Sequence, residues 1–164
     1  MPRRQTRRVG RRVQEAVEIL HANGCITTSA LQAALGLNHS EAYHVLTALK
    51  KAGNAVEVLL GKTSIWCRDE ETARRVVDEL KSEVRRLLCS NGRMRYATPS
   101  RVLELVESDG QAREVFSRYV LLDKTRNQSY KPQALAFAYA VLRELFGESP
   151  FQRYRERPIY LVTC

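Results

Sequence analysis

The sequence predicts a mainly α-helical protein with a small β component, in an N-terminal part and a helical C-terminal part. Three observations predict this fold class. Apolar residues recur at three- and four-residue spacing along most segments, which is the period of an amphipathic helix. Two short β-favouring runs flank a glycine-containing turn at Gly61-Lys62, as in a hairpin. Asparagine–glycine and similar pairs near residues 24, 53 and 92 separate the elements.

The composition is that of a soluble globular protein. The chain has 164 residues, of which 44% are hydrophobic and 27% charged, enough for one large domain or two small ones. No apolar run approaches the ~20 residues that a membrane span needs. The arginine-rich start lacks the apolar region of a secretory signal. We therefore expect a cytoplasmic protein with no membrane partner, nucleoid-associated if it binds DNA.

The net charge of +9 is unevenly distributed along the chain. Residues 1–12 contain six basic side chains and no acid, whereas residues 13–69 contain four basic and five acidic ones. Such an excess favours a polyanionic partner, chiefly nucleic acid. Residues 1–8 show no apolar periodicity, so we expect a flexible basic arm. The candidate phosphate contacts of this region are Arg3, Arg4, Arg7, Arg8, Arg11 and Arg12.

The next segments, up to residue 68, predict three helices and three strands. A helix fits Val9–Ala22, and a short strand fits residues 25–27. Thr28 or Ser29 is expected to cap a second helix that Gly36 ends. Ser40 is expected to cap a third helix over residues 41–52. The expected inward positions of these two helices are Leu31, Ala34, Leu35, Ala42, Val45, Leu46 and Leu49. Residues 55–60 and 63–68 are expected to form the hairpin.

The remainder is predicted to be mainly helical. Asp69 is expected to cap a long connecting helix in residues 69–92, whose apolar stripe runs from Ala73 to Leu88. This stripe can serve as a dimer seam, giving a homodimer, or can pack on the chain's own C-terminal helices. Residues 93–164 form the expected helical C-terminal domain. Its helices are expected at 98–106, 111–120 and 131–146, followed by a strand at 158–164.

The order helix, strand, helix, turn, helix, hairpin over residues 10–68, in the expected domain 9–68, resembles the winged helix-turn-helix family of DNA-binding domains. The resemblance covers about a third of the chain. It implies that the third helix enters the major groove of double-stranded DNA. It also places Lys62 and Thr63 at the wing tip, beside the minor groove or the backbone. The outward residues of the third helix are the candidate DNA contacts: Ser40, Tyr43, His44, Thr47, Lys50 and Lys51.

Two alternatives to DNA binding stay open from the sequence. Winged helices also dock proteins, and the acid Glu41 at the start of the third helix would repel phosphate. The protein can therefore be an adaptor in a nucleic-acid-processing complex. RNA is a second alternative, because arginine-rich arms also bind RNA. Residues 151–157 alternate basic and aromatic side chains, which suits either a nucleic-acid strand or a solvated charged loop.

Four cysteines, at positions 25, 67, 89 and 164, lack the Cys-x-x-Cys spacing of a zinc site, so no metal is expected. In the cytosol they would ordinarily be reduced, and intracellular disulfides are rare outside hyperthermophiles. The winged-helix resemblance implies that Cys25 lies beside Cys67, where a disulfide can form. A Cys89–Cys164 bridge is a further alternative.

No pattern in the sequence indicates catalysis. The three histidines, at positions 21, 39 and 44, fit no nucleophile or metal motif. There is no phosphate-binding loop or dinucleotide fingerprint. We therefore expect no catalytic residue and no cofactor. The resulting hypothesis is a non-catalytic DNA-binding protein, either a transcription regulator or a chromatin-associated protein.

Overall fold

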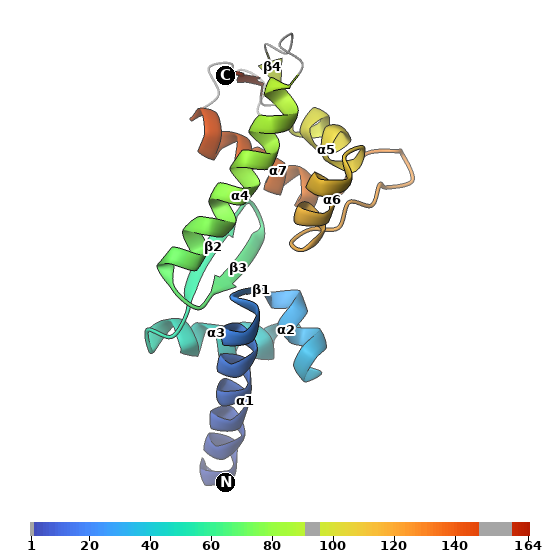
Figure 1. Cartoon of the computed structure of the whole chain (residues 1–164). Helices are drawn as coiled ribbons and strands as arrows, with labels where there is room; N and C mark the ends of the chain where they lie inside the picture. Colours follow the sequence, from blue (N-terminus) through green and yellow to red (C-terminus); the bar gives the residue numbers. More distant parts are fainter. Residues whose placement is uncertain (1, 91–95, 148–158) are drawn as a thin grey trace. The chain divides into compact units, whose positions relative to one another are not determined.

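The structure is a computed structural model that describes residues 2–90, 96–147 and 159–164, with side chains from Gly10 onward (Figure 1). It is mainly helical with a small antiparallel sheet, as the sequence predicted. The chain forms two compact units. The N-terminal unit contains Met1–Leu59 and Ser64–Val76, and the C-terminal unit contains Leu60–Thr63 and Val77–Cys164. Within the described ranges, no helix is long and apolar enough to cross a membrane.

The N-terminal unit follows the expected order of elements. Three helices and three strands succeed one another: α1 (Pro2–Asn23), β1 (Cys25–Thr27), α2 (Thr28–Leu35), α3 (His39–Lys51), β2 (Val56–Leu60) and β3 (Thr63–Cys67). The strand order in the sheet is β1-β3-β2, and β1 pairs antiparallel with β3. The predicted hairpin is therefore present, and β1 is added to its second strand.

The first helix begins earlier than the sequence predicted. Residues 2–8, expected as a flexible arm, form the first two turns of α1. Arginine is a good helix former. Proline is favoured in the first turn, because an N–H at that position has no acceptor within the helix and its absence costs no hydrogen bond. Apolar periodicity alone could not find this segment, because it reports which face is buried rather than where a helix starts.

The N-terminal caps of α2 and α3 both lie before the residues predicted. Thr27, not Thr28 or Ser29, caps α2, and its hydroxyl accepts from the Ala30 N–H at 3.1 Å. Thr28 is instead buried, and its hydroxyl accepts from the Trp66 indole N–H at 3.0 Å. Asn38, not Ser40, caps α3. Gly36 ends α2 in the left-handed conformation, as predicted.

The core of this unit forms beneath α3. All four predicted inward residues of α3 are buried, and α3 contacts both α1 and α2. From α2, Leu31 is buried and Leu35 half-buried, but Ala34 is exposed, so that prediction was wrong. A two-turn helix has room for a single buried row, and Leu31 occupies it. The burial of these residues leaves the opposite side of α3 toward solvent.

The connecting helix α4 (Glu70–Cys89) begins after Asp69, whose carboxylate accepts from the Thr72 N–H at 2.7 Å. The unit boundary falls inside this helix, after Val76. Leu80, Val84 and Leu88 of its apolar stripe are at most 1% exposed in the single chain. These three residues of the stripe are therefore covered within the chain itself, as in the alternative in which the stripe packs on the chain's own helices.

The C-terminal unit is built around α7 (Pro132–Phe146), which buries Phe137, Val141 and Leu142. Its other elements are β4 (Tyr96–Ala97), α5 (Pro99–Glu107), α6 (Gly110–Ser117) and β5 (Tyr160–Leu161). A strand was predicted at 158–164, but in the structure the strand β5 contains only Tyr160 and Leu161. It pairs with β4, which the sequence did not predict. The basic–aromatic segment 151–157 lies outside the described residues.

Candidate nucleic-acid interface

The start of α3 is fixed by reciprocal hydrogen bonds. The Asn38 side chain accepts from the Glu41 N–H at 2.8 Å, and the Glu41 carboxylate accepts from the Asn38 N–H at 3.1 Å. This capping box satisfies backbone donors that the helix itself leaves open. The other carboxylate oxygen of Glu41 accepts from the Arg12 guanidinium at 2.8 Å. The Asn38 backbone bond and the Arg12 bond both lower the pKa of Glu41.

This arrangement changes the meaning of Glu41. The sequence presents it as an unpaired acid that would repel phosphate. In the structure its charge is balanced by Arg12, a residue of α1, 29 positions earlier in the chain. The ion pair therefore brings the arginine-rich helix to the start of α3. The signal for the capping box was present in the sequence, since Asn38 precedes Glu41 by three residues.

The middle of α3 presents polar and aromatic groups to solvent. Ser40 and His44 are exposed, and Tyr43 is 46% exposed. The Tyr43 ring meets Trp66 edge-on, with centroids 5.9 Å apart, and stacks on His39 at 6.3 Å. Because Trp66 is almost fully buried, it holds one side of the Tyr43 ring against the unit's core. The sequence did not single out Trp66 or His39 as supports of this face.

Thr47 and the two lysines occupy the end of α3. Thr47 is half-buried, and its hydroxyl donates to the Tyr43 carbonyl at 2.7 Å. The Lys50 ammonium pairs with Glu57 at 3.1 Å, and Ser64 donates to the other oxygen of Glu57 at 2.8 Å. Lys51 is exposed and forms no ion pair with a residue that the structure describes. Of the two lysines predicted to contact DNA, Lys51 is thus the one that no acid of the described residues pairs with.

The arginines of α1 follow two rows by their spacing. Residues 3, 7 and 11 are four apart, and so are residues 4, 8 and 12, and this interval keeps residues on one side of a helix. Arg11 has a side chain that is 84% exposed and forms a long ion pair of 3.6 Å with Glu15. Arg12, in the other row, is the partner of Glu41. The side chains of the first four arginines lie outside the described atoms.

The hairpin tip differs most from its predicted role. Lys62 is exposed, but Thr63 is only 4% exposed, and its hydroxyl accepts from the Gln133 side chain at 3.3 Å. A Cβ atom at Gly61 would lie 2.5 Å from the carbonyl carbon and oxygen of Ala136. The structure therefore places the side chain of Thr63 in the packing against α7 and not on the surface. Packing against α7 removes it from solvent, which the sequence of the hairpin could not reveal.

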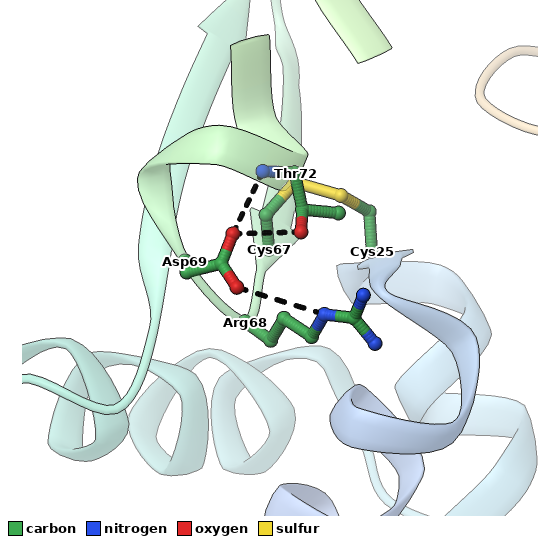
Figure 2. Close-up of a disulfide and its surroundings, with 5 residues drawn as sticks. All are labelled: Cys25, Cys67, Arg68, Asp69 and Thr72. Atoms are coloured by element: carbon green, nitrogen blue, oxygen red, sulfur yellow. Dashed lines mark hydrogen bonds and ion pairs between the residues drawn. A yellow bond between two sulfur atoms is a disulfide. The ribbon is translucent and has the colours of Figure 1, made fainter. Parts of the chain in front are cut away.

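The Cys25–Cys67 bridge, one of the predicted alternatives, is present (Figure 2). The two residues are direct partners across β1 and β3, with Cα atoms 4.0 Å apart. Beside it, Asp69 accepts from both the N–H and the hydroxyl of Thr72, and Arg68 pairs with Asp69 at 3.6 Å. A second bridge joins Cys89 to Cys164. Neither bridge contributes a group to the exposed face of α3.

A charged cluster in the C-terminal unit has a different character. Glu83 is 6% exposed and accepts from Arg86 at 2.7 Å and from the Gln111 side chain. Arg86 also donates to Asp109 at 2.8 and 3.1 Å, which lowers the pKa of Asp109 to about 2. These bonds join α4 to the start of α6. Every member has a partner, and no metal-holding group of His, Cys, Asp and Glu occurs in the described part of the chain.

No protein-family model matches the chain, and no curated protein matches it. A crystal structure of a hypothetical protein from Pyrobaculum spherical virus is similar to it, with a TM-score of 0.77 and 30% sequence identity. The similarity covers 94% of this chain and 95% of the viral protein. At this identity over nearly the whole of both chains, the two proteins belong to one family.

Proposed function

We propose that this chain, a member of the same family as the Pyrobaculum spherical virus protein, is a non-catalytic protein that binds double-stranded DNA. In this proposal the N-terminal unit is a winged helix-turn-helix, and α3 is the helix that enters the major groove. The order of its elements and the sheet order β1-β3-β2 support that assignment. We propose a transcription regulator or a chromatin-associated protein as its role.

The observation that carries the proposal is the exposed face of α3. Ser40, Tyr43 and His44 offer hydrogen-bond donors and acceptors within the first half of the helix, the part that reads bases in helix-turn-helix proteins. The major groove is wide enough for a helix and shows a different pattern for each base pair. Glu41, the one acid in α3, is paired with Arg12, so it presents no unbalanced charge to phosphate.

The supporting electrostatics come from the N-terminal segment. Six arginines in twelve residues would neutralise phosphates and release their counterions, which makes binding depend steeply on salt. The rest of the N-terminal part is close to neutral. In the proposal, the arginines therefore supply most of the affinity, and the exposed face of α3 supplies any sequence preference.

The test is a titration of duplex DNA with the full chain over a series of salt concentrations, beside two variants. Y43A/H44A removes the centre of the exposed face, and R74A removes an arginine that is 77% exposed on α4. We expect wild-type affinity to fall steeply with salt. Y43A/H44A should lose about 1–3 kcal/mol of preference for a selected sequence over a random one, the range for one good base contact. R74A should match wild type.

Two results would contradict the proposal. If the wild-type chain fails to bind duplex DNA near physiological salt, DNA is not the partner, and the same titration with RNA then tests the other polyanion. If binding occurs but Y43A/H44A keeps its full preference, α3 is not the reading helix.

A protein-docking role has one observation in its favour, since Leu59 on the edge strand β2 is 64% exposed. If an L59S variant binds DNA as wild type does, Leu59 takes no part in DNA binding, and the surface for protein docking is separate from the DNA-binding surface.

A further inference from the structure

The tip of the β2–β3 hairpin, residues 60–63, belongs to the C-terminal unit. Leu60 and Thr63 are each 4% exposed, and the Thr63 hydroxyl is bonded to Gln133. Gly61 approaches the Ala136 backbone so closely that there is no space for a Cβ atom. Of the four residues, Lys62 alone carries an exposed side chain of any length. The tip therefore packs on α7, and the side chains that make this packing cannot also contact a ligand.

The arginine-rich half of α1 is placed differently. Its row of residues 4, 8 and 12 ends at Arg12, which is bound to Glu41 in the first turn of α3. Because α1 is one continuous helix from Pro2 to Asn23, this single contact fixes where the basic half starts. From Arg12 to Pro2 the helix extends about 15 Å, at 1.5 Å per residue. Along a DNA duplex, the phosphates of one strand are about 3.4 Å apart in the direction of the duplex axis. The length of this part of α1 therefore corresponds to about four base pairs.

We infer that α1 makes the flanking contact to the DNA phosphate backbone that the hairpin makes in other winged helices, and that the hairpin tip here is an internal packing element. The inference rests on the proposed function, and it names the surface that a bound duplex covers beside α3. The tip offers one cation, Lys62, whereas α1 offers two rows of three arginines. A row that starts at α3 can follow the phosphates next to the groove that α3 enters.

The experiment measures the salt dependence of duplex binding for wild type and three full-length variants. R4A/R8A removes two members of the α1 row that starts at Arg12 and leaves the Arg12–Glu41 pair in place. R74A/R75A is the matched control, since both of its arginines are exposed on a helix and paired with a glutamate four residues earlier. K62A removes the cation of the hairpin tip. Thermal unfolding of each variant verifies that the fold is intact.

We expect R4A/R8A to lower the slope of log K against log salt by about 2, since each phosphate contact contributes about 0.9. R74A/R75A and K62A should stay within twofold of wild-type affinity. If K62A lowers the slope as much as R4A/R8A, or R4A/R8A behaves like the control, the inference is overturned while the DNA-binding proposal stands. If wild type does not bind duplex DNA, the proposed function fails, and the inference fails with it.

Discussion

In the N-terminal unit, the ion pairs Arg12–Glu41 and Lys50–Glu57 lie at the two ends of α3, and the middle of its outer face stays open. In the C-terminal unit, Arg86 and Arg118 pair with acids across α4 and α6. The first set of pairs borders a surface, and the second joins two helices. Charged side chains of similar exposure thus border an exposed helix face in one unit and join two helices in the other, so their number alone does not locate a binding site.

The two disulfides continue this comparison. Cys25–Cys67 joins neighbouring strands that are already hydrogen-bonded, and Cys67 is fully buried. Cys89–Cys164 joins the end of α4 to a residue that is exposed. The two bridges close loops of comparable length, 42 and 75 residues. They should therefore contribute similar free energies but differ in their access to a reducing agent.

The largest expected effect is on the free energy of unfolding when either bridge is removed. The loop-closure model gives about 4 kcal/mol for each of C25S/C67S and C89S/C164S, with less than about 1 kcal/mol between them. Urea unfolding of the two variants measures this. In the folded wild type, a mild reductant followed by alkylation and mass spectrometry should label Cys89 and Cys164 first. Four free thiols in the unreduced, denatured protein would contradict both bridges.

A second test concerns the packing of the hairpin tip. Gly61 and Gly36 both have a positive φ, +66° and +63°, but no atom lies within 4 Å of a Cβ at Gly36. G36A should cost about 1 kcal/mol, the penalty for a left-handed alanine. G61A should cost about 3 kcal/mol, since overpacking adds to that penalty. Urea unfolding of both variants gives the difference. Equal costs would mean that the tip is not packed against α7.

The smallest expected effect is a pH dependence in the C-terminal cluster. Hydrogen bonds from Arg86 lower the pKa of Asp109 to about 2, so this carboxylate stabilises the fold above its ordinary pKa of about 3.9. That stability is lost as the pH falls toward 2. D109N keeps a side chain that caps helices but removes the charge. D109N should unfold more easily than wild type at pH 7, and the gap should shrink below pH 4.

Chemical unfolding at pH 7 and at low pH measures this gap. E104Q is the control, because Glu104 forms an exposed pair with Arg101 on the surface of α5. Such pairs contribute little, so E104Q should follow wild type at every pH. If D109N and wild type unfold alike at pH 7, Asp109 acts through its cap alone and the Arg86 bonds add no pH-dependent stability.

Elements with a strong local pattern were predictable from the sequence. The four inward residues of α3 follow the helical period, and Gly36 and the Gly61-Lys62 turn mark where elements end. The caps were harder, because Thr27, Thr28 and Ser29 are consecutive and chemically alike. Tertiary packing decides among them, since Thr28 is needed inside as the partner of Trp66.

The candidate interface was predictable as a helix face but not as a set of partners. The outward positions of Tyr43 and His44 follow from the buried ones. The pairing of Glu41 with Arg12, and of Lys50 with Glu57, joins residues that are far apart or on different elements. The burial of Thr63 depends on α7, which lies 70 residues later at Gln133. No local pattern contains such information.

The confined hairpin tip also affects how this protein can be labelled. Exposed loop tips are ordinarily the sites that accept an inserted epitope, dye tag or fused domain. Here an insertion at Gly61-Lys62 would separate β2 from β3 and displace residues that touch Gln133 and Ala136. The loop at residues 123–129 is exposed throughout and lies between α6 and α7. A reporter placed there would leave the N-terminal unit, which contains α3 and the arginines of α1, without an insertion.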